Sequence, residues 1–252
     1  MNQKTDYIAV FDSGVGGISV LRQLKKVMPN ERYLYFGDSA NAPYGTKSSQ
    51  QVQQLALAVA RHLVAQGVKA LVVACNTATA VAIDILRQTY PDLIVVGIEP
   101  ALKMGADKYP GGNIGVMATP VTLEGDKFHR LLDRFTDCCK ISLISAPGLA
   151  DLVEEGKQNS PEGELLLRSL LEPYRGKIDA LVLGCTHYPF AEEMIRKVLG
   201  GETELLDGGE GTAAQTKHLL QTRGLLYDGP GEVVFQNSLP GESMLELSRK
   251  LL

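Results

Sequence analysis

The sequence predicts an α/β protein with two pseudosymmetric, doubly wound parallel-sheet domains and an active site in the cleft between them. Three observations predict this fold. Short apolar runs alternate with amphipathic stretches along the chain, which is the order of βαβ units. Several runs are apolar at every position, as expected for parallel strands that are covered on both faces. The same order of runs then occurs a second time.

The repeat is clearest around two cysteines. Residues 69–77, KALVVACNT, align with residues 179–187, DALVLGCTH, at an offset of 110. Residues 8–13 align with residues 114–119 at an offset of 106, and a third pair of strands aligns at 108. Such nearly constant offsets predict two copies of one α/β unit.

The predicted elements fall into these two units. The predicted strands cover residues 7–11, 32–36, 70–74, 93–98, 113–117, 141–145, 180–184 and 204–207. The predicted helices cover residues 16–28, 49–66, 77–90, 121–135, 161–173, 189–199 and 211–223. We expect a first domain of residues 1–98 plus 208–252 and a second of residues 99–207. The tail after Leu206 is expected to pack back on the first domain, with residues 232–238 as an edge strand.

Composition and charge argue against several classes of protein. The chain has 252 residues, of which 44% are apolar and 21% charged, and its net charge is −4. No block of Lys or Arg is long enough to bind nucleic acid or a membrane, so we expect neither partner. The N-terminus, MNQKTDYIAVFD, lacks the basic start and apolar run of a signal peptide. We therefore expect a cytoplasmic protein with free thiols at Cys75, Cys138, Cys139 and Cys185.

Cys75 and Cys185 each stand where a predicted strand gives way to a helix. Ligands of open α/β sheets bind beyond the carboxyl ends of the strands, so the two thiols are expected to face one cleft. Helix N-termini bind carboxylates and activate nearby thiols, and Asn76 or Thr77 is expected to cap the first of these helices. A single such cysteine is more often a small core residue. Two thiols across one substrate can remove a proton from a carbon and return one to its opposite face, which is two-base racemisation or epimerisation.

Two further motifs have alternative interpretations. The turn DSGVGG, residues 12–17, has neither dinucleotide-binding nor P-loop spacing, so it is either a tight βα turn or a ligand contact. His187 is either a polar turn residue or the base of a Cys–His hydrolase, although we expect side chains so close in sequence to diverge. Cys138 and Cys139 lack CxxC spacing, and we expect no metal site.

Two polar segments could reach the cleft. Residues 39–48 form a Gly/Pro loop that either closes over a ligand through Tyr44 and Gly45 or is a surface turn. In the second unit, Glu154 or its neighbour Glu155 either enters the cleft or lies on a solvated helical face.

Four motifs occur together and in order, VFDSGVGG, PYGTK, ACNTATA and GCTHYPF. From Asp6 to about Thr212 the chain resembles the glutamate racemase family, within the cofactor-independent aspartate/glutamate racemase superfamily. The two cysteine motifs are specific, whereas the glycine loop alone is a weak signal. The resemblance implies interconversion of L- and D-glutamate without pyridoxal phosphate or any other cofactor, and supply of D-glutamate for peptidoglycan. It implies glutamate as the small-molecule partner and is compatible with a homodimer.

The resemblance also implies roles for individual residues. Cys75 and Cys185 are the two acid/base thiols, with Cys75 acting on the D-enantiomer and Cys185 on the L-enantiomer. Asp12 and His187 assist the proton transfers, and Glu154 is the glutamate of the cleft. The implied substrate-binding residues are Asp12, Ser13, Tyr44, Gly45, Asn76, Thr77, Thr119, Thr122, Thr186 and His187.

Three alternatives stay open on the sequence. Aspartate racemase, or another two-cysteine amino-acid racemase or epimerase, belongs to the same superfamily. A bilobal dicarboxylate-binding protein without chemistry would need the glycine loop and the helix N-termini but not the thiols. A thiol hydrolase would use only one of the two cysteines.

Overall fold

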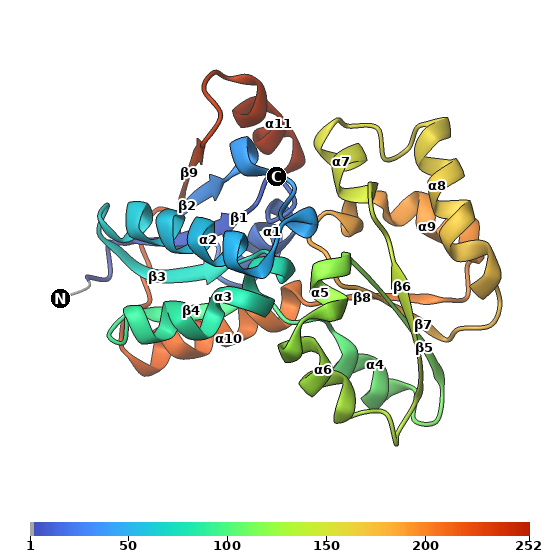
Figure 1. Ribbon diagram of the computed structural model, residues 1–252. Coiled ribbons are helices and arrows are strands. Elements are labelled where there is room, and N and C mark those ends of the chain that lie inside the picture. The colour runs from blue at the N-terminus through green and yellow to red at the C-terminus, as the bar shows by residue number, and fades with distance from the viewer. Residues whose placement is uncertain (1–2) are drawn as a thin grey trace.

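The computed structural model describes residues 3–252 and has two lobes, each built on a parallel sheet (Figure 1). The strands of the first lobe are β1 (Tyr7–Asp12), β2 (Arg32–Gly37), β3 (Val68–Val73), β4 (Ile94–Gly97) and β9 (Glu232–Asn237). They lie in the order β4-β3-β1-β2-β9, and every pairing is parallel.

The second sheet repeats the order of the first. Its strands are β5 (Asn113–Ala118), β6 (Lys140–Ser145), β7 (Ala180–Leu183) and β8 (Glu204–Asp207). They lie in the order β6-β5-β7-β8, again with parallel pairing throughout. When β5 to β8 are matched with β1 to β4, the two orders are the same, and β9 extends the first sheet. The predicted fold class, two pseudosymmetric parallel-sheet α/β domains, is confirmed.

Helices cover both faces of the first sheet because successive side chains of a strand point to opposite sides. The helices of this lobe are α1 (Ile18–Val27), α2 (Ser49–Val64), α3 (Asn76–Thr89), α10 (Gly209–Thr222) and α11 (Ser243–Leu251). Ile8 and Val10 of β1 belong to the core beneath α1 and α10. Ala9 and Phe11 belong to the core beneath α2 and α3. Burial on both faces explains why the strand is apolar at every position.

The second lobe is layered in the same way. Its helices are α4 (Leu102–Lys108), α5 (Pro120–Glu124), α6 (Asp126–Asp133), α7 (Leu149–Glu154), α8 (Pro161–Leu171) and α9 (Glu192–Leu199). Met117 and Leu181 pack with α7, α8 and α9 on one face of the sheet. Ile114 and Val182 pack with α4 and α6 on the other.

The helix prediction was wrong at four places. The helix predicted over 121–135 is divided into α5 and α6, because Gly125 has extended backbone with φ −71° and ψ 134°. Helices α4, α7 and α11 are missing from the predicted helix ranges. None of them begins with a side-chain cap, and α4 contains Gly105, so the usual start signals are missing.

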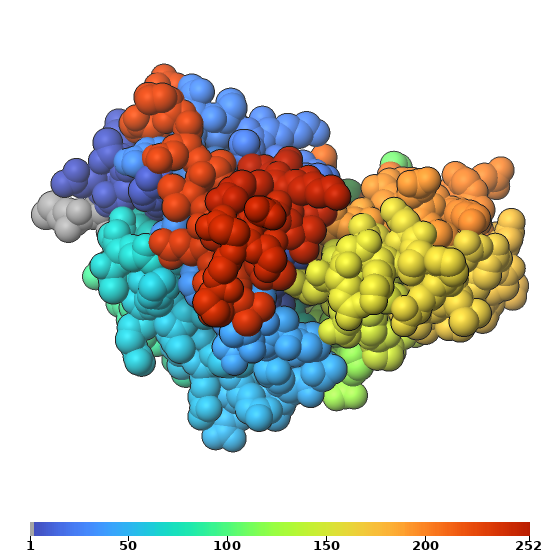
Figure 2. Space-filling view, turned by 90° about the horizontal axis from the view of Figure 1, so that it is seen from above, coloured from blue at the N-terminus to red at the C-terminus, as the bar shows by residue number. Residues whose placement is uncertain are grey.

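The C-terminal tail returns to the first lobe, as the sequence predicted. Strand β9 pairs with β2 at the edge of the first sheet, and α10 packs beside α1. Figure 2 shows the C-terminal segment, in red, covering part of the first lobe, with the yellow and orange second lobe at its side. The domain boundaries at residues 98–99 and 207–208 stay a prediction. Within residues 3–252, no helix combines the length and the apolar character that a membrane span requires.

Candidate active site

The strand ends of both sheets meet at one cavity between the lobes. Five of its lining residues lie within two positions of the ends of β1, β3, β5, β6 and β7: Ser13, Cys75, Thr119, Ala146 and Cys185. The repeat therefore brings the two cysteines to the same cavity from opposite lobes. Its free volume is about 40 Å³, which is room for about one water molecule. The two lobes thus pack closely around this cavity.

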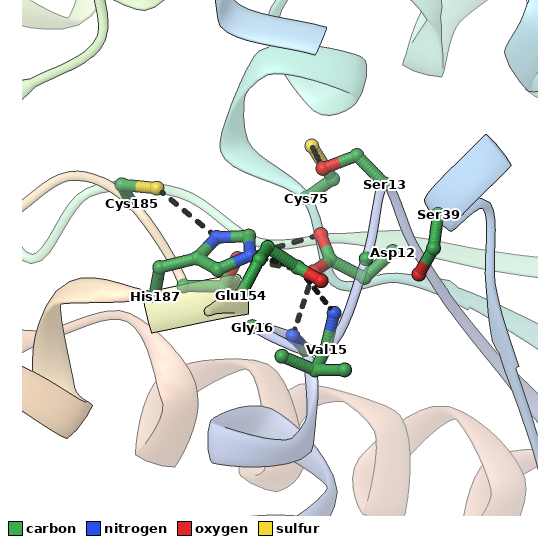
Figure 3. A network of polar contacts seen from close by, with 12 residues as sticks. Asp12, Ser13, Val15, Gly16, Ser39, Cys75, Glu154, Cys185 and His187 are labelled. Atoms are coloured by element: carbon green, nitrogen blue, oxygen red, sulfur yellow. Dashed lines mark hydrogen bonds and ion pairs between the residues drawn. The ribbon is translucent and has the colours of Figure 1, made fainter. Parts of the chain in front are cut away.

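Cys75 is itself the N-cap of α3. Its Sγ accepts a hydrogen bond from the Ala78 backbone N–H at 3.4 Å, so the prediction that one of the next two residues caps this helix is wrong. The sulfur also lies 3.7 Å from the Ser13 hydroxyl oxygen (Figure 3). Burial raises the pKa of the Cys75 thiol, and the nearby carboxylate of Asp12 raises it further, against the opposing effect of the Ala78 N–H. These surroundings favour the protonated thiol.

Cys185 is at the end of a polar chain in the second lobe. Its Sγ lies 3.6 Å from Nδ1 of His187, and Nε2 of His187 lies 2.6 Å from Oε1 of Glu154 (Figure 3). The expectation that the cysteine and histidine side chains diverge is therefore wrong. Burial alone would lower the pKa of His187, but its hydrogen bonds with Cys185 and Glu154 raise it well above the ordinary value. An imidazolium between a carboxylate and a sulfur is the arrangement that stabilises a thiolate.

The structure distinguishes the two candidate glutamates. Glu154 is the last residue of α7 and enters the site, where its Oε1 also accepts the backbone N–H of Val15 from the first lobe at 2.7 Å. Glu155 instead pairs with Lys157 at 2.6 Å, and both side chains are more than half exposed. The bond from the Val15 N–H to Glu154 crosses between the lobes. It links the series of contacts Cys185–His187–Glu154 to the glycine loop.

Asp12 is fully buried at the end of β1. Its Oδ2 accepts the backbone N–H of Gly17 at 2.8 Å, and the Thr186 hydroxyl lies 3.4 and 3.5 Å from its two oxygens. Burial raises the pKa of the Asp12 carboxyl, while the positive charge on His187 and the Gly17 N–H limit the rise. Its contact with the Thr186 hydroxyl reaches the Cys185 side of the cavity, and its negative charge also raises the pKa of Cys75.

The glycine loop after β1 is where the second lobe rests on the first. A Cβ on Gly14 would collide with the carboxylate of Glu154, and a Cβ on Gly16 would collide with the imidazole ring of His187. Figure 3 shows both side chains reaching this loop. These glycines therefore make room for side chains of the other lobe. The sequence alone predicts only a tight turn or a ligand contact for this loop.

The loop after β2 closes another side of the cavity. Tyr44 is buried, and its hydroxyl donates to Asp38 at 2.6 Å. Burial, and next the hydrogen bond to Asp38, raise the pKa of Tyr44, which keeps the phenol neutral. At Gly45 a Cβ would stand 2.9 Å from the Cβ of Thr119, so the glycine lets this loop pack on the second lobe. The surface-turn alternative does not fit such burial.

Polar side chains from both lobes complete the walls. The hydroxyl oxygens of Thr77, Thr119 and Thr122 lie 3.0 to 3.2 Å from one another across the interface. The Oδ1 atom of Asn76 is buried without a hydrogen-bond partner. A buried amide oxygen of this kind is costly unless a ligand or water satisfies it. The cavity therefore offers hydroxyl donors and acceptors together with an unused acceptor.

Three contacts in this region were not predicted from the sequence. They come from the Val15 N–H, the Asp38 carboxylate and the Ser19 hydroxyl, and each depends on a tertiary contact that no local motif signals. Among residues 3–252, no cluster of three or more His, Cys, Asp or Glu side chains could hold a metal ion. Cys138 is exposed and Cys139 is buried with its sulfur 3.6 Å from the Tyr109 carbonyl, away from the cavity.

The sequence matches the Asp/Glu/Hydantoin racemase family over residues 18–216. The chain belongs to this family. The glutamate racemase of Clostridium botulinum strain Alaska E43 is 42% identical, over 100% of this chain and 99% of that protein.

Two solved structures are similar over nearly the whole racemase fold. The Francisella tularensis glutamate racemase in complex with D-glutamate has a TM-score of 0.85 and 30% identity, covering 99% of this chain and 94% of that one. The Escherichia coli glutamate racemase in complex with L-glutamate and an activator has a TM-score of 0.84 and 30% identity, covering 97% and 95%.

Proposed function

We propose that this chain is a glutamate racemase that interconverts L- and D-glutamate by a two-base mechanism. The observation that carries the proposal is the presence of Cys75 and Cys185 in one closed cavity, one from each lobe. The full-length relatives named glutamate racemase support glutamate as the substrate. A dicarboxylate binder would not need two thiols, and a thiol hydrolase would not need the second.

In the proposed reaction the thiolate of one cysteine removes the proton from Cα. The C–H bond breaks, an S–H bond forms, and the electron pair stays on the substrate as a carbanion. The second cysteine, as a thiol, donates its proton to the opposite face of Cα and becomes the thiolate. We assign Cys185 to the L-enantiomer and Cys75 to the D-enantiomer, so each turnover leaves the site ready for the reverse direction.

The surroundings of the two sulfurs support complementary protonation states. Burial and Asp12 raise the pKa of Cys75, which suits a proton donor. The raised pKa of His187 provides an imidazolium beside Cys185, which suits a thiolate base. Glu154 holds that imidazolium through a 2.6 Å hydrogen bond. In the reverse direction Cys75 must be the thiolate. A protonated, neutral Asp12 would not repel that charge, and burial raises the pKa of Asp12, which favours the protonated form.

Substrate binding is assigned to the polar walls of the cavity. The α-carbon of an amino acid is a weak acid, so the site must stabilise the developing negative charge with fixed donors. We assign this task to backbone N–H groups at the start of α3 and to hydroxyl and amide groups on both lobes. The proposed substrate-binding residues are Asp12, Ser13, Tyr44, Gly45, Asn76, Thr77, Thr119, Thr122, Thr186 and His187. Because Thr77 and Thr119 come from different lobes, a bound dicarboxylate would bridge them.

We infer further that the product D-glutamate supplies peptidoglycan synthesis in the cytoplasm, and that no cofactor is needed. Membership of the racemase family supports this role. Growth of a bacterial strain that requires external D-glutamate should be restored by this gene and not by its Cys75→Ser variant. A homodimer stays a prediction, to be measured by light scattering.

The deciding experiment is proton exchange in heavy water. Purified protein without added cofactor should incorporate deuterium at Cα of either glutamate enantiomer while the optical rotation of the solution falls to zero. Cys75→Ser and Cys185→Ser should each reduce turnover in both directions by several orders of magnitude. Cys138→Ser is the matched control, since Cys138 is exposed and outside the cavity.

The alternatives give different results in the same experiment. Binding of glutamate without exchange, unchanged by serine at both cysteines, would establish a binding protein. An acyl adduct on one cysteine, seen by intact mass, would indicate a thiol hydrolase. Faster exchange with aspartate than with glutamate would indicate an aspartate racemase.

A further inference from the structure

Thr186 stands between Cys185 and His187 and is held from the first lobe. Its carbonyl cannot accept a hydrogen bond from the residue three positions later, because that residue is Pro189, which has no N–H. The Ser19 hydroxyl donates to this carbonyl instead, at 2.9 Å. A buried backbone carbonyl that would otherwise lack this partner is therefore satisfied across the lobe interface.

The Ser19 hydroxyl has two carbonyls within reach. In the first turn of α1 it lies 2.8 Å from the carbonyl oxygen of Gly16, and the Thr186 carbonyl is at nearly the same distance. Gly16 is also the residue against which the His187 ring packs. The hydroxyl therefore has one partner in its own first turn, the Gly16 carbonyl, and a second in the other lobe, the Thr186 carbonyl.

Thr186 is contacted by the first lobe at its other end as well. Its side-chain hydroxyl lies 3.4 Å from Asp12. Two points of contact, one on the backbone and one on the side chain, restrict both the position and the rotation of the turn. Because Cys185 and His187 flank this residue, the same two contacts restrict the sulfur and the imidazole.

We propose that Ser19 is a positioning residue for the Cys185–His187 turn. It sets the approach of the Cys185 sulfur to the substrate, and it does not itself touch the substrate. This inference rests on the proposed racemase function. Without the hydroxyl, the Thr186 carbonyl loses its donor and the turn is less well placed for proton transfer at Cys185.

A substitution that slows proton transfer at only one of the two cysteines has a distinctive kinetic signature. Enantiomers have equal free energies, so kcat/KM must fall equally in both directions and cannot reveal which thiol is affected. The primary isotope effect on kcat/KM with [2-²H]glutamate can reveal it. When the Cys185 step is slowed, the effect rises for the enantiomer whose Cα–H is removed by Cys185. It falls for the other enantiomer, because cleavage by Cys75 is then less rate-limiting.

The test is Ser19→Ala, measured with both deuterated enantiomers. We expect kcat/KM to fall about tenfold, equivalent to about 1.4 kcal/mol, with the two isotope effects moving in opposite directions. Ser19→Thr keeps the donor and should restore most of the activity. The control is Ser169→Ala, because the Ser169 hydroxyl makes the same type of bond to a carbonyl three residues back, at Leu166, but on an exposed helix far from the interface.

The outcomes separate this inference from the proposed function. No racemisation by the unchanged protein would overturn both. Racemisation by the unchanged protein, with Ser19→Ala leaving both isotope effects as they were, would overturn the inference alone. Parallel movement of the two isotope effects would also overturn it, because the substitution would then act on a step shared by both thiols.

Discussion

Lys69 and Glu31 form a buried ion pair whose removal should destabilise the first lobe strongly. Their side chains are 0% and 1% exposed, and Lys69 Nζ lies 2.7 Å from Glu31 Oε2. The same ammonium donates to the carbonyls of Lys4 at 2.7 Å and Leu225 at 3.1 Å. The other Glu31 oxygen accepts the Tyr227 N–H at 2.8 Å. The pair joins β3, which leads to Cys75, to the residue before β2. Its further hydrogen bonds, to Leu225 and Tyr227, join it to the segment that leads to β9.

Lys69→Met preserves the shape of the side chain but leaves the Glu31 carboxylate buried without its cation. Breaking a buried pair on one side costs about 3–5 kcal/mol. For a chain of this size, about 1 kcal/mol corresponds to a shift in Tm of ~2–4 °C, so Tm should fall by roughly 6–20 °C. Adding Glu31→Gln should recover part of the loss, because a neutral amide is less costly to bury than an unpaired charge.

Thermal unfolding followed by circular dichroism measures both variants. The control is Lys103→Met, since the Lys103–Asp107 pair has a similar contact, 2.6 Å, but side chains that are 67% and 62% exposed. Exposed pairs contribute little, so this change should alter stability by no more than about 0.5 kcal/mol. If Lys69→Met lowers Tm no more than this control does, the argument from burial is refuted.

Three further substitutions test the site. Gly16→Ala places a methyl group against the His187 ring and should lower kcat/KM at least tenfold in a racemisation assay. Asp12→Asn removes a carboxyl whose folded-state pKa is raised by burial, so ionisation opposes folding above the ordinary pKa of about 3.9. The variant should therefore melt higher than the unchanged protein at pH 7 and racemise more slowly. The raised pKa of His187 adds stability that is fully present below about pH 6.5 and is lost as pH rises through the folded-state pKa. Glu154→Gln removes a cause of that rise, so the difference in Tm between pH 6 and pH 9 should shrink.

The fold was largely predictable because its strands are buried on both faces. Continuous apolar runs marked the central strands such as β3 and β7, and the offset near 110 residues marked the repeat. The predictions that were wrong concern helix boundaries and short helices, which the local sequence pattern does not encode. Gly125 looks like a tolerated glycine within a helical pattern, yet its extended backbone ends α5 and starts α6. Helix α4 has seven residues and no side-chain cap, and so short a helix depends on the packing of Leu102 and Ala106.

The site was predictable to the level of motifs but not of contacts. The paired cysteines could be recognised because the repeat placed both at strand ends. Which glutamate enters the cavity could not, since Glu154 and Glu155 are adjacent and their side chains point about 100° apart on a helix. The outcome depends on the orientation of α7, which is a tertiary property. Ser19 gave no signal either, because its partner Thr186 is 167 positions away in the chain.

The glycine loop shows most clearly why motif and mechanism can differ. Glycines after a first β-strand usually suggest a backbone that approaches a phosphate. Here Gly14 and Gly16 instead allow Glu154 and His187 of the other lobe to approach the backbone. The Val15 N–H between them donates to Glu154, so a group that could bind a ligand's anion binds a protein carboxylate. The same three residues, Gly14, Val15 and Gly16, therefore pack the second lobe against the first and hold Glu154 and His187 on the Cys185 side of the site.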